Sequence, residues 1–262
     1  MPCAPAAHFY VSLPMTDPWD PDIAALDLTP AEKNGLQVYR NYSTAFQRHR
    51  AERFVQQLDA QTYDVGVLSR VLGHIAVEEG RAVPVIACAF ADEVMLAMLR
   101  REVPNGVPGG KAALFSGFGA LGRLSSRLQV CYAFGWLDQH LLEELDGLRK
   151  IRNDISHKWD VAALKDRIEQ FVQAGAHPVE EAFDDSGRVP EAFYKLLDPI
   201  GRLRLRVIWI LGRVFYECLT WVPVLKEGLP PHATLYLKNR PKLLTQIADE
   251  CMKASRCVVG SC

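Results

Sequence analysis

The sequence lacks a dominant charge of either sign. Its 30 Lys and Arg residues nearly balance 31 Asp and Glu residues, which gives a net charge of -1. A near-neutral chain has no whole-molecule attraction for polyanions, so nucleic-acid binding would require a local basic patch. Charged residues make up 23% and hydrophobic residues 49% of the 262 residues. These values exclude a disordered chain and predict a globular protein with a sizeable core.

Paired cysteines are also lacking. The seven cysteines form no CxxC pair and no Cys/His spacing that suits zinc. We therefore expect no metal site, no cofactor and reduced thiols, as in cytosolic proteins. Cys251, Cys257 and Cys262 lie near the C-terminus and could form a redox or metal tail, although incidental thiols of a terminal segment are the commoner case.

Membrane and nucleotide signatures are absent as well. The most apolar stretch, 207–225, is interrupted by Arg213, Glu217 and Pro223, which predicts a buried helix and no membrane span. The N-terminus lacks the features of a secretory signal, so we expect a cytoplasmic protein. Residues 106–112 resemble a phosphate loop only superficially, because Ala112 stands where Ser or Thr should bind magnesium. No nucleotide cofactor is expected.

Alternating strand patterns are nearly missing, and helical periodicity with caps predicts an all-α protein, a multi-helix bundle. The expected helices cover 30–58, 63–79, 84–101, 121–134, 138–157, 161–174, a short segment from Glu191, 199–220 and 241–254. Three segments follow from this pattern: an acidic, proline-rich arm over 1–29, a helical domain over 30–225, and a C-terminal helix with a cysteine-containing tail over 226–262. Phe9, Tyr10 and Trp19 could dock the arm.

The helix expected over 30–58 mixes basic and aromatic side chains. Its arginines are Arg40, Arg48, Arg50 and Arg53, and its aromatic residues are Tyr39, Tyr42, Phe46 and Phe54. Such a mixture could stack and clamp a nucleic acid, which makes the four arginines candidate nucleic-acid contacts. The favoured interpretation places the aromatic rings toward the core and the arginines in solvent.

The helix expected over 84–101 is apolar nearly all round, which predicts burial. Asp92 and Glu93 stand in its middle and would need partners there. In the helix over 138–157, the apolar stripe of Leu141, Leu145 and Leu148 continues to Arg152. A core-facing arginine needs a carboxylate or an anionic ligand, and we expect Asp92 or Glu93 to supply it.

The segment 152–157, RNDISH, is the candidate functional centre. A histidine titrates near neutral pH and can move a proton, while a guanidinium can hold a phosphate, so Arg152 and His157 together could cleave RNA without a metal. The alternative is structural: Arg152 pairs with an interior carboxylate and His157 ends the helix. Asn153 and His157 share a helix face, whereas Arg152 and His157 are about 140° apart.

Residues 119–128 (GALGRLSSRL) and 132–137 (YAFGWL), followed by the helix that ends at His157, resemble the mannitol operon repressor (MltR) family in order and spacing. The likeness extends more faintly over 72–220. It implies an all-helical regulator of transcription that acts through protein partners.

The Arg-x4-His pattern is similar to the motif of HEPN ribonucleases, helical proteins of toxin and phage-defence systems. That resemblance implies a dimer in which Arg152 binds phosphate, His157 acts as acid and base, and Asn153 positions the substrate. Two hypotheses therefore stand: an MltR-like regulatory protein with a protein partner or a second copy of itself, and a metal-independent HEPN-like endoribonuclease acting on RNA.

Overall fold

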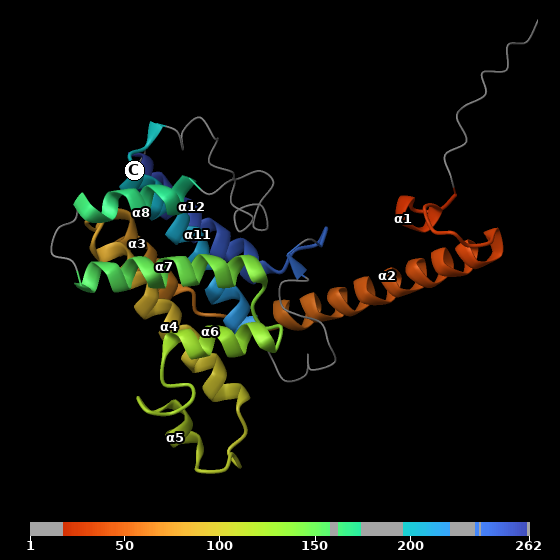
Figure 1. Cartoon of the computed structure of the whole chain (residues 1–262), viewed down its shortest axis with the longest axis horizontal. Helices are drawn as coiled ribbons and strands as arrows, with labels where there is room; N and C mark the ends of the chain where they lie inside the picture. The colour runs from red at the N-terminus through yellow and green to blue at the C-terminus, as the bar shows by residue number, and fades with distance from the viewer. Residues whose placement is uncertain (1–17, 158–161, 174–195, 221–233, 236, 261–262) are drawn as a thin grey trace, which may run out of the picture. The chain divides into compact units, whose positions relative to one another are not determined.

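The computed structural model describes residues 18–157, 162–173, 196–220, 234–235 and 237–260. Its regular elements are helices, with no strand in these ranges, so the prediction of an all-α multi-helix bundle is confirmed (Figure 1). The helix expected from Glu191 begins outside the described residues. The chain divides into two compact units, Met1–His49 and Arg50–Cys262.

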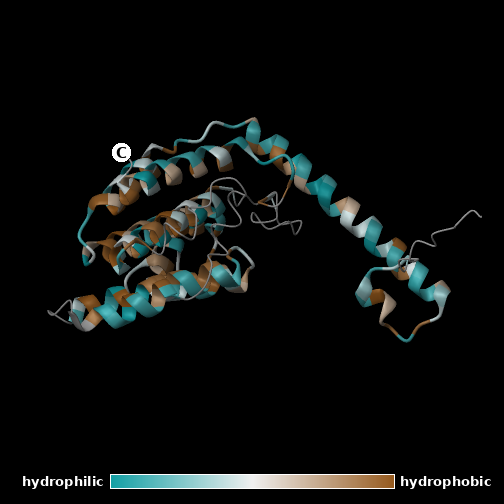
Figure 2. Cartoon of the chain, turned by 90° about the horizontal axis from the view of Figure 1, so that it is seen from above, coloured by the Kyte–Doolittle hydropathy of each residue, from teal (hydrophilic) through white to brown (hydrophobic). Residues whose placement is uncertain are grey.

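The first unit contains α1 (Pro21–Ala24) and the first part of α2 (Pro30–Asp59). The helix α2 begins as expected. The backbone N–H of Thr29 donates to Glu32 Oε2 at 2.9 Å, and the backbone N–H of Glu32 donates to Thr29 Oγ1 at 3.4 Å. This reciprocal capping and Pro30 at the first helical position stabilise the helix start. Figure 2 shows that α2 is largely hydrophilic along its length.

The segment around α1 is held along one side of α2 by polar contacts. Lys33 Nζ donates to the Ala24 carbonyl at 2.6 Å, and Trp19 Nε1 donates to Asn34 Oδ1 at 2.8 Å. Arg40 forms ion pairs with Asp20 at 2.9 Å and with Asp22 at 2.5 Å. These contacts involve residues 19–24, in the C-terminal part of the expected acidic arm, and they hold this part of the arm against α2.

The second unit is a bundle of eight described helices. They are α3 (Gly66–Val77), α4 (Ala82–Glu102), α5 (Lys111–Phe115), α6 (Leu124–Ala133), α7 (Gln139–His157), α8 (Ala162–Gln173), α11 (Pro199–Thr220) and α12 (Lys242–Val259). The central helix is α11, which packs against α3, α4, α7, α8 and α12.

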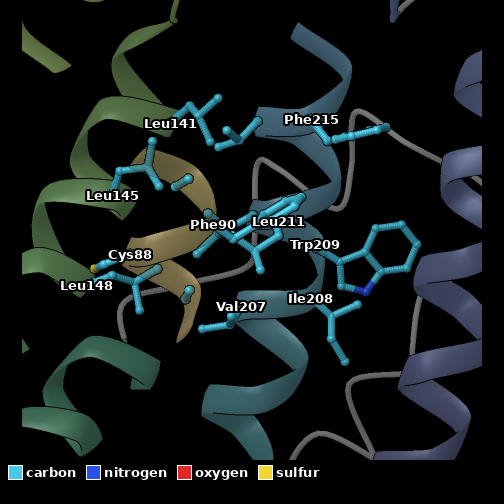
Figure 3. Close-up of a cluster of buried hydrophobic side chains, with 14 of the residues drawn as sticks. Cys88, Phe90, Leu141, Leu145, Leu148, Val207, Ile208, Trp209, Leu211 and Phe215 are labelled. Carbon is cyan, nitrogen blue, oxygen red and sulfur yellow. The ribbon is translucent and has the colours of Figure 1, made fainter. Parts of the chain in front are cut away.

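The helix α11 is buried on all sides. Every residue from Leu205 to Cys218 is buried. Figure 3 shows its side chains Val207, Leu211 and Phe215 among residues of α4 and α7. A helix that is hydrophobic all round belongs in the centre of a bundle, because no face of it is suited to water.

The charges inside this bundle are paired. Arg206 Nε donates to Glu144 Oε2 at 2.7 Å, and the Arg206 guanidinium lies 4.4 Å from the centre of the Phe171 ring. Arg213 forms ion pairs with both Glu217 and Asp138. Burial raises the pKa of Glu217 to about 7, while the charge of Arg213 acts in the opposite direction. Such pairs are costly to break, since each buried charge depends on its partner.

The helix α4 is less buried than its composition predicts. One strip of it is exposed, and this strip includes Val85 and Glu93. Within the described ranges, α4 is the one helix with the length and composition to cross a membrane, and half of its most apolar window is buried inside this chain. Core helices of soluble proteins can have the same length and apolar composition. Since α4 packs against α3, α6, α7 and α11, we interpret it as a core helix.

The glycine-rich block before α6 forms close backbone turns. A Cβ atom built on Gly119 would lie 2.1 Å from the Ala113 carbonyl oxygen, and one on Gly122 would lie 2.1 Å from the Ser116 carbonyl oxygen. Neither position has room for a side chain. The buried Arg127 then fixes the turn, because its Nε donates to the Leu121 carbonyl at 2.9 Å.

Four cysteines are free and buried, namely Cys88, Cys131, Cys218 and Cys251. Cys257 is disulfide-bonded, which corrects the expectation that the thiols are reduced. Burial raises the pKa of the Cys131 thiol to about 12. The buried thiols therefore behave as small core side chains and not as reactive groups.

Candidate functional site at the end of α7

The buried row of α7 differs from the stripe expected from the sequence. It runs through Leu145, Leu148, Ile151 and Ile155. The prediction that Arg152 occupies this row is therefore wrong. After Leu148, the next residue on this face of the helix can be residue 151 or residue 152. The apolar Ile151 is buried, and Arg152 beside it is half-buried.

Arg152 lies near the Cys88 thiol of α4, and its positive charge lowers the pKa of that thiol against the larger, opposite effect of burial. The Nε atom of Arg152 is itself buried and has no hydrogen-bond partner among the described residues. The expected carboxylates are engaged otherwise: Asp92 forms an ion pair with Arg127, and Glu93 is exposed. The pairing of Arg152 with Asp92 or Glu93 is thus corrected, since α6 supplies a closer cation to Asp92.

Cys88 lies in the interior, next to Leu148 (Figure 3). Burial raises the pKa of its thiol, and the positive charge and hydrogen bond of Arg152 counteract this only in part. The thiol is therefore neutral at neutral pH and is a poor nucleophile. Cys88 and Arg152 lie where α4 packs against α7.

Further contacts hold the last turn of α7. Arg81 Nη2 donates to the Ile155 carbonyl at 3.1 Å, and Asp154 forms an ion pair with Arg167 of α8. A cation at a helix C-terminus is favourable, because the terminal carbonyl groups carry partial negative charge. The end of α7 is therefore well anchored within the bundle.

Asn153 and His157 are placed differently from Arg152. Asn153 is half-buried, His157 is exposed, and the structure records no hydrogen bond or ion pair from either side chain to another described residue. Being four residues apart, they lie on one face of the helix.

A single chain does not assemble Arg152 and His157 into one site. Their side chains leave α7 about 140° apart, and Arg152 is directed to Cys88. His157 is exposed and has no ion-pair partner among the described residues. These residues also contain no group of three or more His, Cys, Asp or Glu side chains that could hold a metal ion.

The basic candidates on α2 are only partly available. Arg40 is engaged by Asp20 and Asp22, and its hydrogen bonds lower the pKa of Asp22 to about 2. Arg48 and Arg53 are exposed, and Arg50 is half-buried.

The aromatic residues of α2 do not all face a core. Phe54 is buried as expected, but Tyr39 and Tyr42 are each 71% exposed and Phe46 is 51% exposed. The interpretation that aromatic rings of this helix pack inward is therefore wrong for these three. Their helical spacing predicted a buried face, but each of these three side chains is more than half exposed.

The sequence did not predict that Cys88 and Arg81 lie at the α7 site. Cys88 carries no polar signal in an apolar helix, and Arg81 lies in a turn far from α7 in the sequence.

Comparison with known proteins found no matching family model, no matching curated protein and no matching solved structure. The resemblance to MltR and HEPN proteins therefore rests on residues 119–128, 132–137 and 152–157 alone.

Proposed function

We propose that this chain is an MltR-like regulatory protein of the cytoplasm, which acts on transcription through contacts with other proteins and without a cofactor. The observation that supports this is the position of Arg152. Its side chain is half-buried near the Cys88 thiol of α4, whereas His157 is exposed. Arg152 thus lies where α4 packs on α7, as we expect of a residue with a structural role.

The charge distribution also favours a protein partner over a nucleic acid. The chain is close to neutral, and Arg40, one of the four candidate arginines of α2, is neutralised by two aspartates. A direct DNA reader would need a basic patch. Regulation through another protein has no such requirement.

Sequencing of cellular RNA tests the regulatory function. The strains to compare are one that lacks the protein, and that strain complemented with wild type, with His157→Ala or with His140→Ala. We expect a set of transcripts to change when the protein is lost. Wild type and both variants should restore them, because His140 and His157 are both exposed and structurally dispensable. An unchanged transcript profile in the deletion strain would contradict the proposal.

The second candidate function is a metal-independent, HEPN-like endoribonuclease. It is favoured by one observation: Asn153 and His157 share a helix face, and neither side chain has a hydrogen-bond or ion-pair partner among the described residues. In this case the Arg152 of one copy would bind the phosphate beside the His157 of another. The histidine would accept the proton of the attacking ribose hydroxyl and return it to the leaving oxygen.

An RNA cleavage assay in EDTA separates the two functions. The ribonuclease proposal predicts cleavage by wild type and by His140→Ala, no cleavage by folded His157→Ala, and a rate that changes with pH where histidine titrates. The regulatory proposal predicts that none of the three proteins cleaves structured or unstructured RNA. Cleavage that persists in His157→Ala would exclude this motif as its source.

A further inference from the structure

The helix α4 carries an apolar strip on its exposed side. This α4 strip consists of Val85, which is 44% exposed, the exposed Ala89 and Ala97, and the half-buried Leu96. At about 100° per residue, these four residues lie within about 120° of one another around the helix. Half of the most apolar window of α4 is buried inside the chain, so the rest of it is at least partly exposed. Contiguous exposed apolar surface is typical of an interaction site.

Two charged side chains accompany the α4 strip, one of each sign. Glu93 and Arg100 are both exposed, and neither forms an ion pair within the described part of the chain. The Arg100 guanidinium lies 6.0 Å from the centre of the Phe115 ring, a contact that leaves its N–H groups able to bind a carboxylate. Being seven residues apart, Glu93 and Arg100 lie on the same side of α4, about 10 Å from each other along the helix. Each is therefore open to an opposite charge from a second molecule.

A second copy of the chain can supply both opposite charges. Glu93 and Arg100 lie equally far before and after the midpoint between Leu96 and Ala97. When two α4 helices run antiparallel about this midpoint, each Glu93 faces Arg100 of the other copy. The contact is made twice, because a two-fold interface is the same on both copies. Leu96 and Ala97 of the two copies then meet in the middle, and Ala89 of each copy lies beside the last turn of the other α4.

Other arrangements of two α4 helices bring like charges together. A parallel pair places Glu93 beside Glu93 and Arg100 beside Arg100, which is unfavourable. An antiparallel pair centred near the middle of α4 places the two Glu93 side chains next to each other. The charges therefore select the antiparallel pairing about Leu96 and Ala97. A lipid bilayer fits the α4 strip less well, since it would desolvate Glu93 and Arg100 without neutralising them.

We propose that the α4 strip is a homodimerisation surface that pairs antiparallel with the α4 strip of a second copy. Burial of Ala89, Leu96 and Ala97 provides the hydrophobic contribution. The two contacts between Glu93 and Arg100 set the direction and register of the helices. All of these residues belong to one helix of the unit Arg50–Cys262. This inference does not depend on the function proposed for the end of α7.

Sedimentation velocity of the full chain over a concentration series tests the association. We expect a dimer for wild type and for the control Ala133→Glu, which alters an exposed alanine at the end of α6. Ala97→Glu should weaken the dimer at least tenfold, because it places two carboxylates at the centre of the interface. Circular dichroism spectra check that the variants remain folded. A monomeric wild type, or a dimer insensitive to Ala97→Glu, would overturn the proposal.

Exchange of the two charges tests the register. Glu93→Arg and Arg100→Glu should each weaken the dimer at least tenfold, because each creates contacts between like charges. The double variant restores opposite charges and should recover the dimer. Glu79→Arg, at an exposed acidic residue outside α4, is the matched control and should leave the dimer unchanged. A double variant no tighter than the single ones would rule out the pairing of Glu93 with Arg100.

Disulfide trapping tests the direction of the helices. Residue 97 lies close to its own counterpart in the antiparallel pair, so Ala97→Cys should crosslink two chains under mild oxidation, above the level of wild type. Residue 89 lies about 22 Å along the axis from its counterpart, so Ala89→Cys should not crosslink. The reverse result would exclude the antiparallel arrangement. Flotation of monomeric wild type with phosphatidylcholine vesicles, lost in Ala97→Glu, would instead assign the strip to a membrane.

Discussion

Arg152 of α7 lies near the buried Cys88 thiol of α4, and its positive charge opposes the rise that burial causes in the pKa of that thiol. His157 lies five residues further along α7 and is exposed. The two residues of the motif thus have separate surroundings: Arg152 is half-buried within the bundle, and His157 faces outward.

This separation predicts different effects of substitution. Arg152→Ala should lower the free energy of unfolding by about 1–3 kcal/mol, because it removes a half-buried side chain that lies near Cys88, where α7 packs against α4. His157→Ala should change it by less than about 0.5 kcal/mol, as exposed positions usually do. Urea denaturation followed by circular dichroism measures both. Equal stability of Arg152→Ala and wild type would show that this side chain contributes nothing.

The pair Arg206–Glu144 provides a test of buried charge. Glu144→Ala leaves the Arg206 guanidinium uncompensated and should cost about 3–5 kcal/mol of stability. Replacing both residues, with Glu144→Leu and Arg206→Met, should cost clearly less, because no charge remains buried. Chemical denaturation of the two proteins gives the comparison. If the double variant is the less stable one, the pair is worth more than the hydrophobic contacts that replace it.

Glu217 should make stability depend on pH. Its pKa is raised from 4.5 to about 7 in the folded protein, chiefly by burial. Between these values the folded state binds more protons than the unfolded state, so the free energy of unfolding should fall as the pH rises through this window. Glu217→Gln should reduce that slope when unfolding is measured at several pH values. The exposed Glu79→Gln serves as control, and an unaltered slope in Glu217→Gln would assign the dependence elsewhere.

The glycine turns before α6 allow a closely matched comparison. Gly119→Ala would place a methyl group 2.1 Å from a backbone oxygen, and the forced shift should cost about 1–3 kcal/mol or more. Gly117→Ala, two residues away, meets nothing within 4 Å and should be tolerated. Thermal denaturation distinguishes them. Similar melting temperatures for the two variants would mean that the turn adjusts easily.

Much of the fold could be predicted because local signals mark the helix ends. Thr29, Pro30 and Glu32 mark the start of α2, Pro199 starts α11, and Gly135 adopts a positive φ after α6. These residues act through their own backbone conformations and neighbouring hydrogen bonds. No knowledge of the rest of the chain is needed to interpret them.

The details of the candidate site depend on contacts between distant segments. The apolar stripe of α7 allowed either residue 151 or residue 152 at the buried position, and packing against α4 decides in favour of Ile151. The pairing of Asp92 with Arg127 likewise joins α4 to α6, 35 residues apart in the sequence. The exposure of Tyr39 and Tyr42 contradicts their spacing, because a periodic pattern shows which residues share a face but not what covers it.

The central position of α11 has a consequence for synthesis of the chain. The helices α3, α4, α7 and α8 leave the ribosome before Pro199–Thr220 and bury their apolar sides against it. Until that segment is made, those sides have no permanent cover and are a target for chaperones and for aggregation. A chain that stops before Pro199 cannot close its interior, so the fold is completed only late in translation.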